Sequence, residues 1–415
     1  MVRMKPFKAV RPAKGYEEKV AALPYDVMTS DEARRMVEGN PYSFLHIDKA
    51  EIDLPPSVDL YDASVYARAK ENFERFASEG VFVQDERRNF YIYRLTMDGR
   101  AQTGLVGCAS IDDYLNDKIK KHELTREEKE KDRIRHVDTL DANTGPIFLT
   151  CRPNARLDEV IEAWISEHAP LFDFVADDGV AHTIWTADGE IVPEIERIFE
   201  GIDALYIADG HHRCASAVKV GLKRRESDPA YKGDEEFNFF LSVVFPSNQL
   251  RILDYNRVVK DLNGYAIDAF LEKLGKGFVA ERYDAEGPYR PEAKHSIGLY
   301  TGGHWYKMTT REGLFDENDP VSRLDVSILQ DNVLRPILGI DDPRTDKRID
   351  FIGGIRGLKE LERRVADDMA AAFAMYPTTV EDLMDIADAN RIMPPKSTWF
   401  EPKLRSGLLI HRLSE

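Results

Sequence analysis

The chain has 415 residues, of which 43% are hydrophobic and 10% aromatic, a composition typical of a globular protein with a substantial core. This length accommodates two or three domains, or one large domain with insertions. The formal net charge of -17 argues against broad nucleic-acid binding, because such binding needs a basic face, but it does not exclude a small basic pocket.

The cysteines and the apolar segments bear on the cellular compartment. Cys108, Cys151 and Cys214 form a sparse, odd set without CxxC spacing, which is typical of a reducing compartment. The first residues lack a long apolar stretch, and no later run approaches the length of a membrane-spanning helix. We therefore expect a cytoplasmic protein that does not enter membranes.

The first third of the chain alternates helical and extended patterns. Tyr66, Ala69, Phe73 and Phe76 recur at helical spacing and predict an amphipathic helix. In chain order we expect a capped helix over 29–39, a strand over 42–47, this amphipathic helix over 60–79, and a hairpin of strands 90–95 and 103–108 that turns near Asp98-Gly99.

The rest of the chain continues this alternation, and no repeat of 20–50 residues is visible. We expect a helix over 157–168, strands over 172–175 and 182–186, a strand pair over 237–244 and 250–259, and strands over 297–299, 305–308, 349–352 and 408–410. The pattern predicts an α/β or α+β fold. Turn clusters suggest an N-terminal α+β region over 1–145, a central region over 146–260 and a C-terminal α/β region over 261–415.

The central motif is Asp209-Gly210-His211-His212-Arg213-Cys214, which follows a short apolar run over 202–208 and precedes a helical pattern. A helix N-terminus offers unpaired N–H groups and a positive dipole end, so this junction predicts an anion site. The alternative is that Asp209 is only an N-cap, Gly210 only a turn and the histidines a surface pair. We expect Cys214 to be a buried packing residue of the helix rather than a nucleophile.

Two further segments carry polar groups suited to the same chemistry. The charged stretch over 112–137 reads most simply as a solvated helix face, yet its basic end runs on to Asn143-Thr144-Gly145-Pro146 at the start of an apolar strand. Near the end of the chain, the proline-rich segment over 393–403 either places Lys396, Ser397 and Thr398 on an anion or serves as a rigid connector.

Several of these motifs occur together in a known order: Leu23-Pro24-Tyr25-Asp26-Val27, His122-Glu123-Leu124-Thr125, Asp132-Arg133-Ile134-Arg135-His136-Val137, Asn143-Thr144-Gly145-Pro146, Ala208-Asp209-Gly210-His211-His212-Arg213 and Pro394-Pro395-Lys396-Ser397-Thr398-Trp399-Phe400. With them the chain resembles, over essentially its whole length, a widespread microbial family related to the ParB/sulfiredoxin-like superfamily. The resemblance implies a ParB/sulfiredoxin-like core with a mixed sheet and large N- and C-terminal elaborations.

The resemblance also implies an activity. Free-serine kinases of that superfamily carry a similar Asp-Gly-His-His-Arg segment, and some members of the family look like serine kinases that use pyrophosphate. The implied reaction moves a phosphoryl group from pyrophosphate, ATP or ADP to the hydroxyl of free L-serine, giving O-phosphoserine, with Mg²⁺ as the usual cofactor of such a transfer.

Residue roles follow from the matching motifs. The donor phosphate would be held by Gly210, His211, His212 and Arg213, with added positive charge from Arg133, Arg135 and Lys396. The catalytic carboxylate would be Asp26 or Glu123, which rank almost equally, and Asp209 ranks after them. The substrate would contact His136, Asn143, Thr144, Ser397 and Thr398. Asp209 is also a plausible metal or substrate ligand, but the sequence assigns no definite metal site.

Two other functions stay open. A metal-dependent phosphohydrolase would use the histidines and acids, although His122 and Glu123 are adjacent and lack HExxH spacing. A nucleotide-binding ParB-like regulator would use the same turn as a switch, because a fold does not settle a function. As partners we expect a small-molecule substrate and neither membrane nor nucleic acid, and a homodimer is left open.

Overall fold

The computed structural model describes residues 1–414 and divides them into two compact units. Unit 1 comprises residues 1–250 and 402–414, and unit 2 comprises residues 251–401. The chain therefore leaves unit 1 once and returns to it. The turn cluster near 145 lies inside unit 1, and the one near 260 lies inside unit 2.

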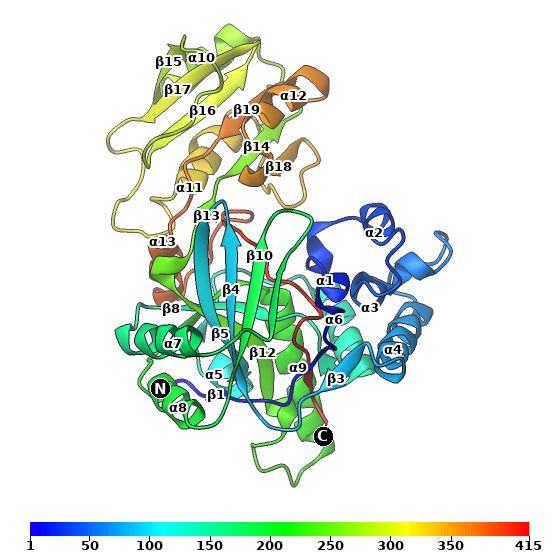
Figure 1. The fold of residues 1–415 in the computed structure, drawn as a ribbon. Coiled ribbons are helices and arrows are strands. Elements are labelled where there is room, and N and C mark those ends of the chain that lie inside the picture. The colour runs from blue at the N-terminus through cyan, green and yellow to red at the C-terminus, as the bar shows by residue number, and fades with distance from the viewer. Residues whose placement is uncertain (415) are drawn as a thin grey trace. The chain divides into compact units, whose positions relative to one another are not determined.

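Unit 1 is built on a mixed sheet that has nine strands within the described residues, in the order β6-β11-β8-β12-β5-β4-β10-β9, with β1 beside β5 (Figure 1). The strands are β1 (Met4–Lys5), β4 (Phe90–Met97), β5 (Arg100–Ser110), β6 (Ile119–Lys120), β8 (Ile147–Cys151), β9 (Phe172–Val175), β10 (Ala181–Ala187), β11 (Leu205–Asp209) and β12 (Phe239–Pro246). β11 is parallel to β6, and β12 is parallel to β8, whereas the other pairs are antiparallel. The expected α/β class with a mixed sheet is confirmed.

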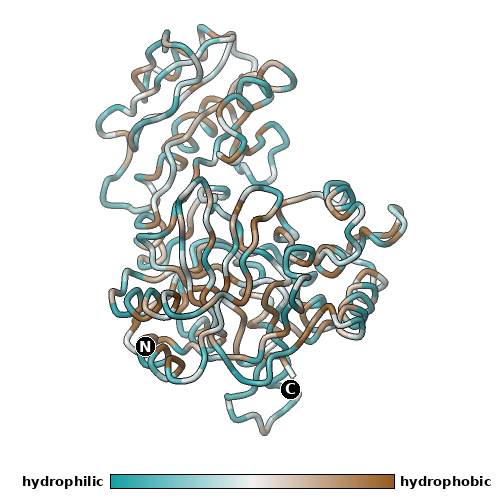
Figure 2. Tube along the Cα trace, in the orientation of Figure 1, coloured by the Kyte–Doolittle hydropathy of each residue, from teal (hydrophilic) through white to brown (hydrophobic). Residues whose placement is uncertain are grey.

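The helices of unit 1 pack into two large apolar clusters and one small one between α6 and α9. They are α1 (Glu17–Val20), α2 (Ser30–Met36), α3 (Leu45–Asp48), α4 (Ala63–Ser78), α5 (Ile111–Leu115), α6 (Glu127–Leu140), α7 (Ala155–Glu167), α8 (Ile191–Glu200) and α9 (His211–Ser227). Leu157 of α7, Phe199 of α8 and Val218 of α9 join the core of the large sheet. The N-terminal helices α1 to α4 gather around Phe44 and Phe76, away from that core (Figures 1 and 2).

Short elements complete unit 1. They are the strands β2 (Val10–Pro12), β3 (Phe82–Gln84), β7 (Ala142–Asn143) and β21 (His411–Arg412), and the 3₁₀ turns η1 (Tyr25–Val27), η2 (Ala50–Asp53), η3 (Glu236–Asn238) and η4 (Ser247–Gln249). β21 pairs with β7 in antiparallel register, which brings the C-terminal segment of unit 1 beside the loop that precedes β8.

Unit 2 contains an antiparallel sheet of six strands in the described residues, ordered β15-β17-β16-β19-β14-β18. These are β14 (Tyr255–Val259), β15 (Phe278–Tyr283), β16 (Ser296–Thr301), β17 (His304–Thr310), β18 (Ile349–Gly353) and β19 (Ala371–Ala374), accompanied by the pair β13 (Ile252–Leu253) and β20 (Trp399–Phe400) and by α10 (Ile267–Leu274), α11 (Asp325–Leu329), α12 (Lys359–Asp367) and α13 (Val380–Asp388). α11 runs directly into the π-helical turn η5 (Gln330–Leu334), and the 3₁₀ turn η6 (Gly354–Arg356) follows β18.

Most sequence predictions with a strong local signal are confirmed. The helix expected over 29–39 is α2, and Thr29 and Glu32 form a capping box at its start. The helix expected over 60–79 is α4. Asp98 and Gly99 both have positive φ, as the type I′ turn between β4 and β5 requires.

Three expectations are wrong. The segment 42–47 is not a strand, because α3 begins at Leu45 and turns Phe44 and Ile47 into the N-terminal cluster. The strands expected over 237–244 and 250–259 exist as β12, β13 and β14, but β12 and β14 belong to different sheets. The last strand is β21, just after the expected 408–410, and Ile410 forms only an isolated bridge with Val10.

Within residues 1–414, no helix has the length and apolar character needed to cross a membrane.

Candidate functional site

The junction of β11 and α9 has the geometry that its sequence predicts. The register of β11 against β8 shifts between Ile207 and Asp209, a bulge that re-aims the end of the strand. Gly210 follows with a φ of 94° and caps α9. A Cβ on Gly210 would lie 3.1 Å from Cζ of Arg213, so the glycine serves both the left-handed backbone and the close approach of the guanidinium.

Strand pairing brings distant segments to this junction. Asp209 is paired with Phe148 of β8, so the loop that precedes β8 lies at the same edge of the sheet. Nη1 of Arg213 donates to the carbonyl oxygen of Pro146 at 2.6 Å. From the C-terminal segment, the backbone N–H of Gly407 donates to the carbonyl oxygen of Thr144 at 3.3 Å.

Asp209 is held by positive charges. Its Oδ2 lies 3.4 Å from Nζ of Lys403 and 3.8 Å from Nη2 of Arg213, and its Oδ1 accepts from the backbone N–H of Gly210 at 2.9 Å. Burial alone raises the pKa of Asp209, but Lys403 and Arg213 outweigh it and hold the pKa at about 2. The carboxylate is therefore ionised and already paired.

Arg213 is a nearly buried cation, its side chain being 11% exposed. Burial tends to lower the pKa of Arg213, but the carboxylates of Asp26 and Asp209 outweigh burial and raise it. Nε of Arg213 is buried and has no hydrogen-bond partner among the described residues. A bound ligand with an acceptor atom at this place would satisfy that N–H group.

Two cavities in unit 1 share one wall, and Arg213 lines the smaller of them. They have volumes of about 30 Å³ and about 230 Å³ and share the walls formed by Tyr25, Asp48, Arg133 and His136. Thr144, Gly145 and Arg213 also line the smaller cavity, whereas Asp26, Tyr61, Tyr66 and Lys129 also line the larger one. We refer to the two together as the unit 1 cleft.

The shared wall is polar and internally bonded. The guanidinium of Arg133 lies 4.0 Å from the centroid of the Tyr25 ring, and its Nε donates to Oδ2 of Asp132 at 2.8 Å. The hydroxyl of Thr144 donates to Oδ1 of Asp48 at 2.9 Å. Burial and then the charge of Arg133 lower the pKa of His136, so this ring is neutral near pH 7.

Both histidines of the motif contact the segment that precedes α6. Nε2 of His211 accepts from the backbone N–H of His122 at 3.4 Å, and the two rings meet edge to face at 4.4 Å. Nε2 of His212 accepts from the backbone N–H of Arg126 at 3.0 Å. Burial is the largest cause that lowers the pKa of both His211 and His212. Because both rings are neutral and hydrogen-bonded, His211 and His212 position the segment that precedes α6 and add no positive charge to the site.

Other expected site residues lie elsewhere or are already bonded. Glu123 is half-exposed, with Oε2 3.7 Å from Nδ1 of His211, and it lines neither cavity of the cleft. Arg135 is exposed and donates to the carbonyl oxygen of Tyr61 at 3.0 Å. Asn143 lines the smaller cavity of the cleft, but its Oδ1 already accepts from the backbone N–H of Leu241 at 3.3 Å.

Three expected residues belong to unit 2. Nζ of Lys396 lies 5.6 Å from the centroid of the Tyr255 ring, and Oγ of Ser397 donates to the carbonyl oxygen of Pro394 at 2.7 Å. Thr398 follows them and is partly exposed. These contacts lie within unit 2, between the proline-rich segment and β14 or inside the segment itself.

Cys214 is a buried, free cysteine on α9, and burial raises the pKa of its thiol. It is a packing residue, as expected, since a reactive cysteine needs the opposite shift.

The sequence reading missed Asp48 and Lys403. Asp48 directly follows the segment 42–47 that was expected to be a strand, and its partner Thr144 is 96 residues away in sequence. Lys403 lies 194 residues from Asp209. A polar residue at the end of an apolar run was a weak signal for Asp48, whereas no local pattern indicates Lys403.

Among the described residues, no group of three or more His, Cys, Asp or Glu side chains is arranged to hold a metal ion.

Comparison with solved structures gives distant likenesses. A mutant free serine kinase in complex with ADP shares 16% identity and a TM-score of 0.36, over 74% of this chain and 93% of that chain. A conserved hypothetical protein from Pyrococcus furiosus shares 15% identity and a TM-score of 0.35, over 73% and 93%. SbnI from Staphylococcus aureus, truncated at its C-terminus, shares 12% identity and a TM-score of 0.37, over 72% and 85%. Similarity at this level carries no argument about activity.

Comparison with curated proteins finds no match. Residues 4–327 match the profile of the family described as "Protein of unknown function (DUF1015)", and the chain belongs to that family.

Proposed function

We propose that unit 1 is a small-molecule phosphotransferase that moves a phosphoryl group from pyrophosphate, ATP or ADP to the hydroxyl of free L-serine. The proposal that this site binds phosphate rests on Arg213, a nearly buried guanidinium at the first turn of α9 whose Nε has no hydrogen-bond partner among the described residues. The choice of serine rests on the motif resemblance, and the ParB/sulfiredoxin-like core expected from the same motifs stays a prediction.

The donor phosphate would bind between Arg213 and the N-terminus of α9. Gly210 caps α9, and the unpaired backbone N–H groups and the dipole of the helix N-terminus favour negative charge. Arg133, 9% exposed, lines the same cleft and would add a second guanidinium. Charge-assisted hydrogen bonds from guanidinium to phosphate are about twice as strong as neutral ones.

Asp26 is the carboxylate best placed to act as general base. It is exposed and lines the unit 1 cleft, so a bound hydroxyl can reach it. Asp209 has its pKa held at about 2 by Lys403 and Arg213, which makes it a poor proton acceptor. Glu123 lines neither cavity.

In the proposed step, Asp26 takes the proton of the serine hydroxyl while Oγ forms a bond to the transferred phosphorus atom. The bond between that phosphorus and the bridging oxygen of the donor breaks. The leaving group is then phosphate from pyrophosphate, AMP from ADP or ADP from ATP, and it keeps the bridging oxygen.

The donor set of the cleft suits Mg²⁺. Mg²⁺ is usually held by one or two carboxylates together with substrate phosphates and water. Asp48 is a carboxylate of the cleft wall that accepts a hydrogen bond from Thr144 and lies within electrostatic reach of Arg133 and Arg213. When bound, the metal supplies charge neutralisation to the transferred group.

The deciding experiment incubates the purified full chain with L-serine, Mg²⁺ and each donor, and detects O-phosphoserine by ³¹P NMR. Asp26→Asn should lower kcat by about 10²- to 10⁴-fold, the usual contribution of a general base. The matched control is Asp31→Asn, which changes an exposed acid of α2 that pairs only with Arg34 in the described structure. It should leave the rate unchanged.

Arg213→Met tests the phosphate site. It should raise the donor KM and lower kcat together, while Arg224→Met, on the same helix but paired with Asp138 and Asp141, should do neither. Absence of O-phosphoserine with every donor overturns the proposal. Phosphate release without serine would instead indicate a phosphohydrolase, and tight nucleotide binding without turnover would indicate a regulator.

A further inference from the structure

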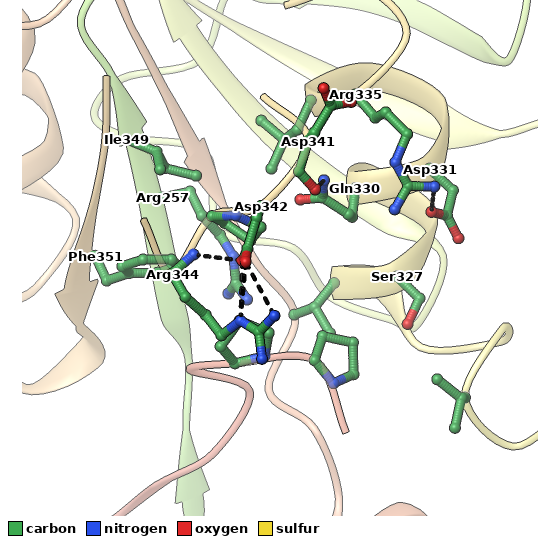
Figure 3. A pocket seen from close by; sticks show the side chains of 16 residues that line it. Arg257, Ser327, Gln330, Asp331, Arg335, Asp341, Asp342, Arg344, Ile349 and Phe351 are labelled. Carbon is green, nitrogen blue, oxygen red and sulfur yellow. Dashed lines mark hydrogen bonds and ion pairs between the residues drawn. The ribbon is translucent and has the colours of Figure 1, made fainter. Parts of the chain in front are cut away.

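A further cavity lies wholly within unit 2 and has no part in the proposed phosphotransfer. Its volume is about 330 Å³, within the usual range for small-molecule pockets. Its walls come from β14, β18, the π-helical turn η5, the loop over 341–344 and Pro394-Pro395 (Figure 3). π-Helical turns occur frequently at functional sites.

Arg257 supplies a buried positive charge to this cavity. It lies in the middle of β14 and is 3% exposed. Its guanidinium donates to the carbonyl oxygens of Tyr255 and Lys396 and lies 5.5 Å from the centroid of the Phe351 ring. A guanidinium has five N–H groups, so these two bonds leave further donors for a ligand.

No carboxylate balances that charge: within the described residues, Arg257 forms no ion pair. Burial lowers the pKa of Arg257 to about 10. This shift expresses the cost of holding a cation in a poorly solvated place without a counterion. An anionic ligand would remove that cost.

Ser327 also lines the cavity, from α11, but it lies apart from Arg257 (Figure 3). Its hydroxyl oxygen is buried and has no hydrogen-bond partner among the described residues. The anion-binding end of the cavity is therefore set by Arg257.

The acidic groups around the cavity do not reverse this preference. Asp331 is paired with Arg335 at 2.9 Å, and Asp342 with Arg344 at 2.9 Å, so each pair is neutral. Asp341 is exposed, and water screens its charge. The buried guanidinium therefore dominates the potential inside the cavity, where the effective dielectric constant is lowest.

We propose that the unit 2 cavity binds a small organic oxyanion whose carboxylate or phosphate head accepts hydrogen bonds from the guanidinium of Arg257. Val326, Leu334 and Phe351 form an apolar part of the wall. The body of the ligand is accordingly apolar and about the size of one ring, given the volume of about 330 Å³.

The test titrates the full chain with benzoate, phenyl phosphate and inorganic phosphate in a calorimeter. At least one aromatic probe should bind one to one at about millimolar concentration or tighter, as expected for ligands of this size, and more tightly than inorganic phosphate. The preferred head group distinguishes a carboxylate ligand from a phosphate ester.

Arg257→Met should weaken this binding by about 10- to 100-fold, the range for losing a charge-assisted hydrogen bond. The matched control is Arg311→Met, which changes an exposed arginine of unit 2 outside the cavity. Arg213→Met should leave the binding intact, and this separates the unit 2 cavity from the proposed phosphate site of unit 1.

Arg257→Lys decides the matter if Arg257→Met does not fold. Because lysine keeps the positive charge but lacks the planar fork of N–H donors, this variant should weaken binding by about 3- to 10-fold. The proposal is overturned if neither aromatic probe binds, or if the folded variants bind as tightly as the unaltered chain.

Discussion

Gly210→Ala probes the geometry of the β11–α9 junction most directly. Gly210 has a φ of 94°, and an added Cβ would lie 3.1 Å from Cζ and Nε of Arg213, closer than the ordinary contact of 3.4 Å or more. The backbone conformation costs a non-glycine residue about 1–2 kcal/mol. The contact then displaces the guanidinium by a few tenths of an ångström.

The matched control is Gly233→Ala, also in unit 1. Gly233 has a φ of 92°, and an added Cβ there would meet nothing within 4 Å. Both variants should lose about 1–2 kcal/mol of unfolding free energy in urea titrations. A 1 Å misplacement of a catalytic group lowers the reaction rate roughly 100-fold. The shift of Arg213 by a few tenths of an ångström should therefore lower the kcat/KM of phosphoserine formation by about 4- to 10-fold, and only in Gly210→Ala. Equal activity losses in the two variants would refute the reasoning.

Two further predictions concern stability. Burial alone raises the pKa of Glu236, but contacts with His411 and Arg88 hold the pKa at about 2. Glu236 therefore contributes about 3 kcal/mol to the free energy of unfolding above pH 4.5, and this contribution is lost as the pH falls toward 2. Glu236→Gln should flatten the acid limb of the unfolding free energy, and an unchanged limb would contradict this. A Cβ on Gly221 would lie 2.4 Å from the carbonyl oxygen of Phe237. Gly221→Ala should therefore lower the urea midpoint despite the roughly 1 kcal/mol that alanine otherwise gains in a helix.

Elements with a local chemical signal were predictable from the sequence. The hairpin of β4 and β5 follows from Asp98-Gly99, which accept positive φ, and α4 follows from an apolar stripe at helical spacing. The segment 42–47 was not predictable in this way, since a short apolar run fits a buried strand or a buried helical turn equally well. The segment forms the helix α3 and not a strand because Phe44 and Ile47 pack against the N-terminal apolar cluster.

The candidate site was predictable only in its local parts. The strand, the glycine and the helix start at Asp209 to Arg213 are encoded in neighbouring residues. The partners of Asp209 and Asp48 depend instead on strand register and on the return of the chain to unit 1, since Lys403 and Thr144 are 194 and 96 residues away in sequence. Periodicity within a window of the chain carries no information about such pairs.

The return of the chain to unit 1 sets the order of events during synthesis. Residues 1–250 emerge first, but Lys403 and the strand β21 follow the whole of unit 2, residues 251–401. At ordinary translation rates this interval lasts roughly 8–30 s. Until then, β7 has no antiparallel neighbour from β21, and Asp209 has no lysine beside it. A ribosome-bound nascent chain therefore carries every residue that lines the unit 1 cleft, but β7 is still an exposed strand edge and Asp209 still lacks its lysine, a state in which we expect chaperones to act.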